Sequence, residues 1–265
     1  MDSFQIQFLG AGSAFTVGDD NYQSNVLITA PSGKRLLLDC GSDARFSLHE
    51  LGLKPTDIDA VYISHPHADH IGGLEWLAFS TCFLPNRVKP KLLVSRMFVN
   101  DLWNKSLAGG LESIEGEMVD LDYYFEVKAI RANGAFVWEG IRFQLVQVVH
   151  IMNSFSIVPS FGLLFTLNGK RIFFTSDTQF SPKQISKFYH MSDLILHDCE
   201  TSPYPSGVHA HYSDLKTLPA EIKRKMWLYH YQPGAKPDAS ADGFAGFVRR
   251  HQIFDFAAAE EQQVA

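Results

Sequence analysis

Four strong metal-binding groups lie within six residues, at His65, His67, Asp69 and His70. The preceding residues 61–63, Val-Tyr-Ile, form a short apolar run with β-branched side chains, which is typical of a buried strand. Residues 71–83 follow with apolar side chains at helical spacing. The four groups therefore belong to a loop between a strand end and a helix start, where a rigid scaffold commonly holds functional side chains.

The spacing of these groups predicts a pair of metal ions rather than one. His65 and His67 are two residues apart and can converge on one point. Asp69 and His70 are offset and can converge on a second point nearby. Neutral imidazole and carboxylate suit Zn²⁺, and Mn²⁺ or Fe also accept such ligands. The plainer alternative is a histidine-rich solvated loop, which the buried strand before it and the glycine pair at 72–73 disfavour.

Other candidate ligands also follow apolar strand patterns. His150 ends the apolar run 143–149, and Asp177 comes shortly after the run 171–175. His150 could instead be a core or surface histidine, and Asp177 could be a cap, but Asp177 could also bridge two ions with its two oxygens. Asp39, at the end of another predicted strand, either orients a ligand histidine or caps the strand end, and the sequence leaves both open.

Strand and helix patterns interleave in two similar halves without a linker. We therefore expect one domain over residues 1–256 and a flexible tail over residues 257–265. With ligands recurring at strand ends, this is the pattern of an α/β protein, a four-layer αβ/βα sandwich. Further strands are predicted at 4–9, 25–29, 35–38, 91–94, 125–130, 136–149, 161–167, 171–175, 194–196 and 227–229, and further helices at 44–51, at 95–107, from Ser181-Pro182 and from Ser213-Asp214.

The motif His65-x-His67-x-Asp69-His70 resembles the signature of the metallo-β-lactamase (MBL) fold superfamily. The resemblance implies a dinuclear centre at one edge of two packed sheets. It implies one ion held by His65, His67 and His150, a second held by Asp69, His70 and His230, and a bridge at Asp177. Two such ions, most suitably Zn²⁺ with Mn²⁺ as the alternative, would activate water for hydrolysis.

The ligand set contains no cysteine, which fits the phosphodiesterase branch of this superfamily better than the lactamase branch. Two later segments also resemble the phosphodiesterase branch. His197-Asp198 and His209-Ala210-His211 resemble paired motifs of the tRNA 3′-processing endonucleases (RNase Z). There a histidine held by a carboxylate protonates the leaving oxygen or clamps the phosphate. The resemblance implies that role for His209 with Asp198 as its orienter, and leaves His211 as the alternative. The catalytic candidates are Asp69, His209 and Asp198.

The chain departs from RNase Z where those enzymes carry a long Gly/basic arm. Only a hairpin separates His150 from Asp177, and no Lys/Arg cluster in the sequence is long enough to grip tRNA. Residues 8–14 (FLGAGSA), 197–200 (HDCE) and 208–210 (VHA) instead resemble the MBL-fold cyclic nucleotide phosphodiesterases, including the anti-Pycsar proteins of phages and bacteria. This resemblance implies a homodimer that hydrolyses 3′,5′-cyclic mononucleotides to linear monophosphates and counteracts cyclic-nucleotide immune signalling.

Three rival classes remain at this point. An RNase Z-like endonuclease acting on tRNA would need a basic exosite, a thioesterase or lactam hydrolase would not need the His209 segment, and a non-catalytic metal-binding protein would lack turnover. Within the phosphodiesterase interpretation, some aromatic side chains could stack on a nucleobase. The candidates are Phe15, Tyr22, Phe155 and Tyr204.

The net charge, the apolar runs and the cysteines restrict which partners and which cellular compartment can be expected. A net charge of −6 over 265 residues disfavours unspecific nucleic-acid binding, which needs a basic face. No stretch reaches the roughly 18 apolar residues of a membrane span, so no membrane partner is expected. The three cysteines, Cys40, Cys82 and Cys199, are odd in number and lack metal-type spacing, which predicts reduced thiols in a cytoplasmic protein.

Overall fold

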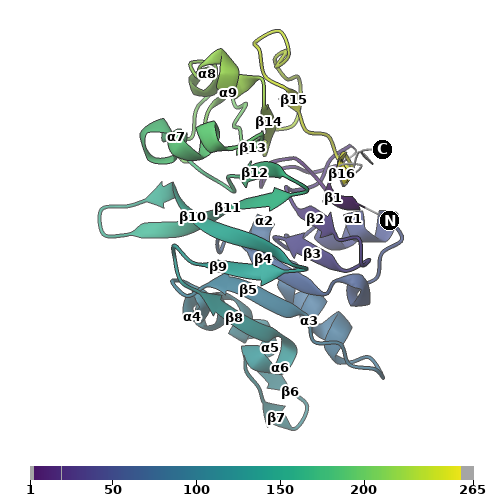
Figure 1. The fold of residues 1–265 in the computed structure, drawn as a ribbon. Helices are drawn as coiled ribbons and strands as arrows, with labels where there is room; N and C mark the ends of the chain where they lie inside the picture. The colour runs from purple at the N-terminus through teal and green to yellow at the C-terminus, as the bar shows by residue number, and fades with distance from the viewer. Residues whose placement is uncertain (1–2, 19, 258–265) are drawn as a thin grey trace, which may run out of the picture.

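Buried apolar strands form two large sheets in the computed structural model, which describes residues 3–18 and 20–257 (Figure 1). Each large sheet within these residues has seven strands. The first has the order β16 (Ile253–Ala257), β1 (Ser3–Phe8), β2 (Val26–Thr29), β3 (Arg35–Leu38), β4 (Ala60–Ile63), β5 (Lys91–Ser95) and β8 (Glu126–Ile130). The second has the order β15 (Gly246–Phe247), β14 (Met226–Tyr229), β13 (Leu194–Asp198), β12 (Lys170–Phe174), β11 (Ile157–Leu167), β10 (Ile141–Met152) and β9 (Ala135–Trp138).

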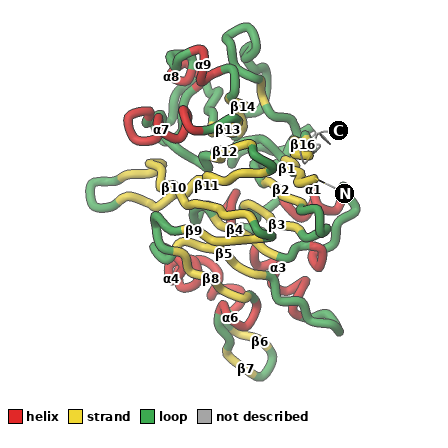
Figure 2. The backbone as a smooth tube through the Cα atoms, viewed as in Figure 1, coloured by secondary structure: helices red, strands yellow, loops and turns green. Residues whose placement is uncertain are grey.

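Side chains that alternate along the strands of the second sheet pack into two different apolar layers. Phe174 and Leu196 belong to the core shared with the first sheet, whereas Phe173 and Ile195 pack into a second cluster with helix residues such as Ile185. The helices of that outer layer are α7 (Pro182–Met191), α8 (Tyr212–Leu215) and α9 (Ala220–Lys223). Figure 2 shows helices on either side of the strands, with α1 (Ala44–Glu50) and α3 (Leu74–Cys82) on the side of the first sheet. The predicted four-layer αβ/βα sandwich is confirmed.

Two predicted helices are divided. The helix expected at 71–83 is α2 (Ala68–Ile71) followed by α3, with a break at the glycine pair, where the chain passes so close to the Cys40–Gly41 backbone that a Cβ on Gly73 would lie 2.4 Å from Gly41 O. The helix expected at 95–107 begins later, as α4 (Val99–Leu102), and continues through the π-type turn η2 (Trp103–Leu107) into α5 (Ala108–Leu111). The remaining short elements are η1 (Pro55–Asp57), β6 (Ser113–Ile114), β7 (Glu117–Met118) and α6 (Leu121–Tyr124).

Two strand predictions also differ from the structure. The run 136–149 is two strands, β9 and β10, because Glu139 and Gly140 both have positive φ (46° and 76°) and form a tight hairpin turn. β16 was not predicted, and it pairs antiparallel with β1, with Ser3 opposite Ala257. Residue 257, assigned to the tail from sequence, is thus the last residue of a strand, and residues 258–265 lie outside the described residues. In the part of the chain that is described, no helix combines the length and apolarity that crossing a bilayer requires.

Gly162 in β11 lies directly against the backbone at the end of β12, the neighbouring strand that leads to Asp177. A Cβ at Gly162 would lie 2.4 Å from Phe174 O and 2.6 Å from Thr175 O, both backbone atoms that cannot rotate away. We expect Gly162→Ala to destabilise the fold by about 2–3 kcal/mol through overpacking. In thermal denaturation this corresponds to a fall in Tm of roughly 4–12 °C for a chain of this size.

The matched control for this prediction is Gly109→Ala in α5. No atom lies within 4 Å of a Cβ built at Gly109, and an alanine in a helix is about 1 kcal/mol more favourable than glycine. The control should therefore keep or raise the Tm. Equal melting temperatures for the two variants would show that β11 and β12 can separate without cost.

Candidate metal centre and active site

The loop after β4 is fixed by Asp39, which lies at the end of β3 with a positive φ of 62°. Asp39 Oδ1 accepts a hydrogen bond from Ser64 N at 2.8 Å, and Oδ2 accepts one from Ser64 Oγ at 2.7 Å. His70 Nδ1 lies 2.8 Å from the same Oδ2 and must donate, because a carboxylate only accepts. Asp39 therefore holds the strand end and orients His70, so both interpretations left open by the sequence apply. His70 Nε2 is therefore directed at another partner.

Three histidines converge on a first point beside this loop. His65 Nε2 lies 2.9 Å from His67 Nδ1, and His150 Nε2 lies 3.2 Å from the same atom. His150 Nδ1 donates to Val208 O at 2.7 Å, so its Nε2 carries the lone pair. The register of β10 shifts between Val149 and Ile151, and a bulge of this kind re-aims a side chain out of the regular alternation.

A second point is formed by Asp69, His70 and His230. Asp69 Oδ2 lies 3.1 Å from His70 Nε2 and 3.2 Å from His230 Nε2. His230 follows β14 with a positive φ of 66°, and its N–H donates to Ala11 O at 2.8 Å. The glycine-rich turn after β1 therefore supports the backbone of this histidine.

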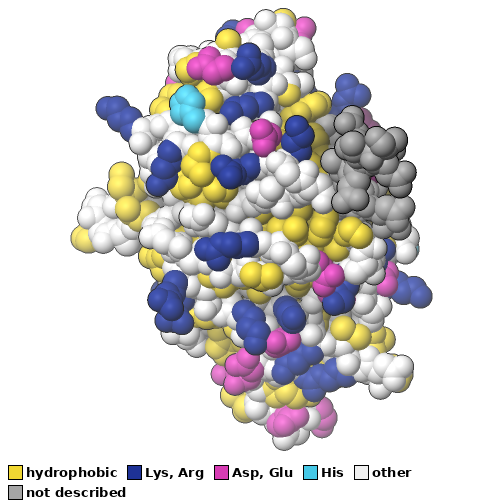
Figure 3. Space-filling model, in the orientation of Figure 1, with side chains coloured by type: hydrophobic (Ala, Val, Ile, Leu, Met, Phe, Trp, Pro, Cys, Tyr) yellow, Lys and Arg dark blue, Asp and Glu magenta, His cyan; other side chains and the backbone are white. Residues whose placement is uncertain are grey.

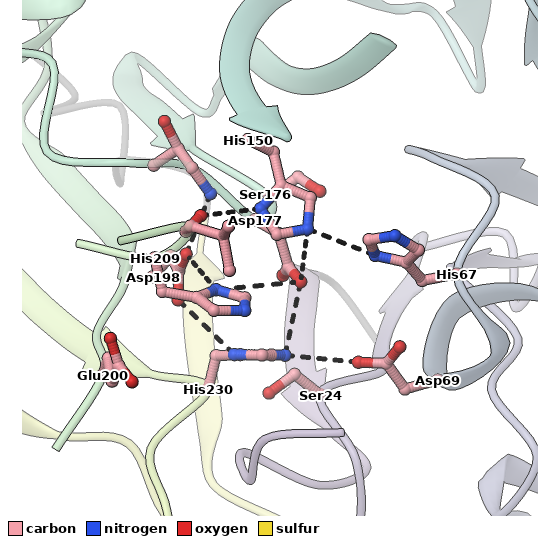
Figure 4. Close-up of polar contacts among 12 residues, drawn as sticks. Ser24, His67, Asp69, His150, Ser176, Asp177, Asp198, Glu200, His209 and His230 are labelled. Carbon is pink, nitrogen blue, oxygen red and sulfur yellow. Dashed lines mark hydrogen bonds and ion pairs between the residues drawn. The ribbon is translucent and has the colours of Figure 1, made fainter. Parts of the chain in front are cut away.

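Asp177 lies between the two points (Figure 4). Its Oδ2 lies 3.2 Å from His70 Nε2 and 3.3 Å from His230 Nε2. Nitrogens of the other three histidines also lie within 4.0 Å of it: His65 at 3.6 Å, His150 at 3.9 Å and His209 at 4.0 Å. Asp177 Oδ1 is buried and has no hydrogen-bond partner among the described residues. One carboxylate is thus shared by both groups of ligands and still has a free oxygen.

The electrostatics of the cluster are those of a cation site. Burial holds the pKa of His65 well below its usual value, so this imidazole is neutral and offers a lone pair. Burial alone would raise the pKa of Asp177, but His230 and His70 outweigh it and hold that pKa well below the usual range. A tetrahedral ion with bonds of about 2.0–2.1 Å separates its ligands by roughly 3.3 Å, close to the spacings found here. The residues therefore fit two divalent ions that share Asp177.

His209 adds a proton-bearing group beside this cluster. Its Nδ1 lies 2.8 Å from Asp198 Oδ2, and its ring stacks on His230 with centroids 4.6 Å apart. Burial lowers the pKa of His209, but the charge and hydrogen bond of Asp198 outweigh it and raise that pKa to about 9. Asp198 Oδ2 is itself held by Thr178 N at 2.8 Å. His209 Nε2 has no hydrogen-bond partner within the described chain, which leaves it available to a ligand.

His211 lies outside the cluster and has both ring nitrogens occupied. Its Nδ1 accepts from Ser213 N at the start of α8, and its Nε2 donates to Ser202 O at 2.9 Å. The N-cap of α8 is therefore His211, not Ser213-Asp214 as the sequence suggested. Of the two histidines in this motif, only His209 lies beside the cluster with a ring nitrogen that has no hydrogen-bond partner among the described residues.

Two buried residues of the neighbouring segment were missed as functional supports. His197 Nδ1 donates to Asp198 O at 2.6 Å, and Tyr189 OH donates to His197 Nε2 at 2.6 Å, so this histidine joins α7 to the end of β13. Glu200 accepts hydrogen bonds from Ser206 N and Ser206 Oγ at 2.9 Å, which closes the loop that carries His209. The sequence HDCE at residues 197–200, directly after an apolar run, could have predicted these supporting contacts, because charged groups buried at a strand end need hydrogen-bond partners.

Three of the four proposed aromatic side chains are free to contact a ligand. Phe15 and Tyr204 are each 84% exposed, and Phe155 is 97% exposed at the tip of the β10–β11 hairpin. Tyr22 is already engaged, because its OH donates to Glu50 at 2.7 Å and Arg250 lies over its ring. The three cysteines are buried and free, and burial raises the pKa of the Cys199 thiol.

Asp43, near the start of α1, gives the fold a pH dependence close to the site. Burial raises its pKa to about 6, although Oδ2 accepts a hydrogen bond from Gln23 N at 2.8 Å. Because an unfolded aspartate titrates near ~3.9, folding favours the protonated form, and the stabilisation is lost as the pH rises from about 4 to about 6. We expect Asp43→Asn to raise the Tm of the metal-free protein at neutral pH and to leave it unchanged near pH 4.

The control for this prediction is Asp122→Asn, at an exposed position on α6. It should give the same difference in Tm from the parent protein at both pH values. A gain for Asp43→Asn that is equally large near pH 4 would contradict the assignment, since the parent carboxyl is already neutral there.

The comparisons with known proteins agree with this geometry. A family model described as "Anti-Pycsar protein Apyc1" matches residues 4–254. The Apyc1 of Paenibacillus xerothermodurans is 36% identical over 259 residues, covering 96% of this chain and 98% of that protein. The Apyc1 of Bacillus phage vB_BveM-Goe7 is 34% identical over 242 residues, covering 87% and 90%.

Solved structures identify the fold. The metallo-β-lactamase fold protein YhfI from Bacillus subtilis matches with a TM-score of 0.74 and 15% identity, over 96% of this chain and all of that one. This confirms the metallo-β-lactamase fold predicted from the His65 motif. The His/Asp clusters add groups of side chains that could hold metal ions within this fold. Because the family model spans nearly the whole chain and the relatives exceed 30% identity, the chain belongs to the anti-Pycsar protein Apyc1 family.

Proposed function

We propose that this protein is a dinuclear-metal phosphodiesterase that hydrolyses 3′,5′-cyclic mononucleotides to linear monophosphates. The observation that carries the proposal is the His209–Asp198 pair beside the cluster centred on Asp177. A proton donor next to a two-cation site is what cleavage of an unactivated phosphate ester requires, because the departing sugar oxygen must take up a proton.

The ligand sets would be those implied by the resemblance. His65, His67 and His150 would hold one ion, Asp69, His70 and His230 the other, and Asp177 both. When bound, two Zn²⁺ or Mn²⁺ ions would lower the pKa of a water and neutralise charge on the phosphate oxygens. Neutral His65 and ionised Asp177 are already in the protonation states that such ligands need.

His209 supplies the proton in this proposal. Asp198 anchors its Nδ1–H, so the proton that leaves is the one on Nε2. With a pKa raised to about 9, His209 is protonated at neutral pH and can donate to the departing ribose oxygen. Thr178 N and the buried position of Asp198 keep the carboxylate from rotating away.

The shape of the chain supports a small substrate. The connection from β10 to β11 is a short turn over residues 153–156, with no long arm in the described chain for gripping a large RNA. Phe15 and Tyr204 project from loops and offer flat apolar surfaces, and stacking of one base on an aromatic ring contributes about 1–3 kcal/mol. Membership of the Apyc1 family supports a cyclic nucleotide as that substrate and a role against cyclic-nucleotide immune signalling.

We further propose that the protein acts as a homodimer. The β10–β11 hairpin projects from the sandwich (Figure 1) and exposes Met152, Phe155 and Ile157. Apolar side chains on a projecting hairpin are favoured where a partner covers them. Sedimentation equilibrium should give twice the monomer mass, and Phe155→Asp should shift the protein toward the monomer. A monomeric parent protein at micromolar concentration would refute the dimer.

The test of the function is direct. Protein loaded with Zn²⁺ or Mn²⁺ is incubated with the four common 3′,5′-cyclic mononucleotides and, separately, with a precursor tRNA, and the products are separated by chromatography. We expect linear monophosphates and intact tRNA. Cleavage of the tRNA without turnover of any cyclic nucleotide would instead assign the protein to RNase Z-like processing.

A further inference from the structure

A hollow lies at one edge of the sandwich, where the turn over residues 131–134 joins the edge strands β8 and β9 of the two sheets. Its volume is about 980 Å³, within the usual range for sites that bind small molecules. Lys91 and Leu93 of β5, Lys128 and Ile130 of β8, and Phe136 of β9 contribute to its lining. None of the candidate metal ligands lines it, so this groove is distinct from the Asp177 cluster.

The groove is strongly basic in a protein of net charge −6. Four cations line it, and its lining contains no Asp or Glu: the cations are Lys91, Arg96, Lys128 and Arg131. Figure 3 shows Lys and Arg side chains gathered over the region of β5, β8 and β9. The sequence showed no such cluster, because these residues come from separate segments that only the fold brings together.

Most of these cations lack a partner in the protein. Lys128 pairs with Glu126 at 2.9 Å, but no ion pair or side-chain hydrogen bond reaches Lys91, Arg96 or Arg131 among the described residues. Some lysines elsewhere on the surface are paired, such as Lys34 with Glu139 and Lys216 with Asp242. Others, such as Lys183 and Lys187, also have no ion pair among the described residues, so what distinguishes the groove is that its cations are gathered in one place. Unpaired like charges gathered on one concave surface repel one another and favour an anionic ligand.

Protection of a sheet edge does not account for this arrangement. A lysine on an edge strand discourages pairing with another chain, and this explains Lys128 on β8. Lys91 lies on β5, which is paired on both sides, and Arg96 and Arg131 follow the ends of their strands. Edge protection therefore does not explain the presence of the other three cations.

The floor of the groove is apolar, which restricts the chemical classes of ligand that it can bind. Leu93, Ile130 and Phe136 form it, and Val137 at its rim is largely exposed. From Lys91 to Arg96 the strand spans roughly 16 Å, at about 3.3 Å per residue. An elongated ligand with several phosphates at one end and a flat apolar ring system at the other matches both the row of cations and this floor. An arginine side chain in particular can bind one phosphate through two parallel hydrogen bonds.

We propose that this groove binds a nucleoside polyphosphate, with its phosphate chain against Arg96, Arg131 and the two lysines and its base over Leu93 and Phe136. The site does not depend on the proposed phosphodiesterase activity. The surrounding charges agree with it: Lys128, with smaller contributions from Lys91 and Lys89, lowers the pKa of Glu126.

The test measures ATP binding to the metal-loaded, full-length protein by calorimetry in about 100 mM salt, where unspecific surface attraction is screened. We expect saturable binding with one ATP per chain. The double variant R96A/R131A should weaken it by about tenfold or more, because charge-assisted hydrogen bonds contribute roughly 1.5–3 kcal/mol each. AMP should bind at least about tenfold more weakly than ATP, since it meets fewer of the cations.

The matched control is K183A/K187A, which removes two exposed lysines from α7, remote from the groove. It should leave ATP affinity unchanged, and both double variants should keep the parent Tm. Unchanged ATP binding in R96A/R131A would place the ligand on the metal centre or elsewhere and overturn the proposal. Equal affinity for inorganic tripolyphosphate and ATP would overturn the nucleoside class, and so would binding of single-stranded RNA without binding of ATP.

Discussion

Replacement of Asp177 by asparagine is expected to reduce turnover of a cyclic nucleotide by about a thousandfold, the scale of losing one preorganised electrostatic group in an active site. Asp177 Oδ2 is the atom on which five histidine nitrogens converge within 4.0 Å. An amide has nearly the same shape but no charge, so it cannot balance two divalent ions. The metal content of the purified variant should therefore fall below two ions per chain, together with kcat.

Metal analysis and steady-state kinetics on the same sample check this expectation. The control is Asp214→Asn, an exposed carboxylate in the first turn of α8 that belongs to none of the clusters. It should retain two ions and full turnover. An Asp177→Asn variant that keeps both ions and most of its activity would remove Asp177 from the bridging position.

The second large effect is expected at His209. His209→Ala should lower turnover of a 3′,5′-cyclic nucleotide by about 10²–10⁴-fold, because an alkoxide of high proton affinity must then leave without a general acid. The metal content should stay at the parent value, since His209 belongs to neither proposed ligand set and its ring forms its hydrogen bond with Asp198. On a p-nitrophenyl phosphodiester, whose leaving group needs no proton, the same variant should lose about tenfold or less.

His211→Asn is the matched control in the same motif. Asparagine can accept from the first N–H groups of α8 as His211 does, so the helix start is kept. Turnover of both substrates should match that of the parent enzyme. If His209→Ala affected neither substrate, the acid would lie elsewhere, and the thioesterase or lactam hydrolase class would regain support.

The fold and the positions of most site residues follow from local sequence because the candidate ligands lie at or near the ends of buried strands. His150, expected at a strand end, lies instead within β10, which continues to Met152. A short apolar run with β-branched residues, such as 61–63, favours a buried strand, and a polar group directly after such a strand emerges at the edge of the sheet. His65, Asp177 and His230 are all of this kind. The structure brings them together, while their roles as ligands stay predictions until metal is measured.

What the sequence could not show depends on contacts between distant segments. β16 forms by pairing with β1, with residue 257 opposite Ser3, and no local sequence pattern near either residue predicts that pairing. The bulge at His150 is set by its partner strand β11, and the basic groove by the meeting of β5, β8 and β9. Local patterns predict elements, whereas register and grooves arise from tertiary packing.

The distribution of the ligands over both sheets has a consequence for the maturation of the protein. His65 follows a strand of the first sheet and His230 a strand of the second, so neither point can form until the two sheets have docked. In small zinc modules the ion drives a short chain to fold, but here a large apolar core shared by the two sheets brings the ligand segments together. Cations would therefore enter a finished scaffold, and a shortage of metal in the cell would yield folded but idle molecules that later supply could switch on.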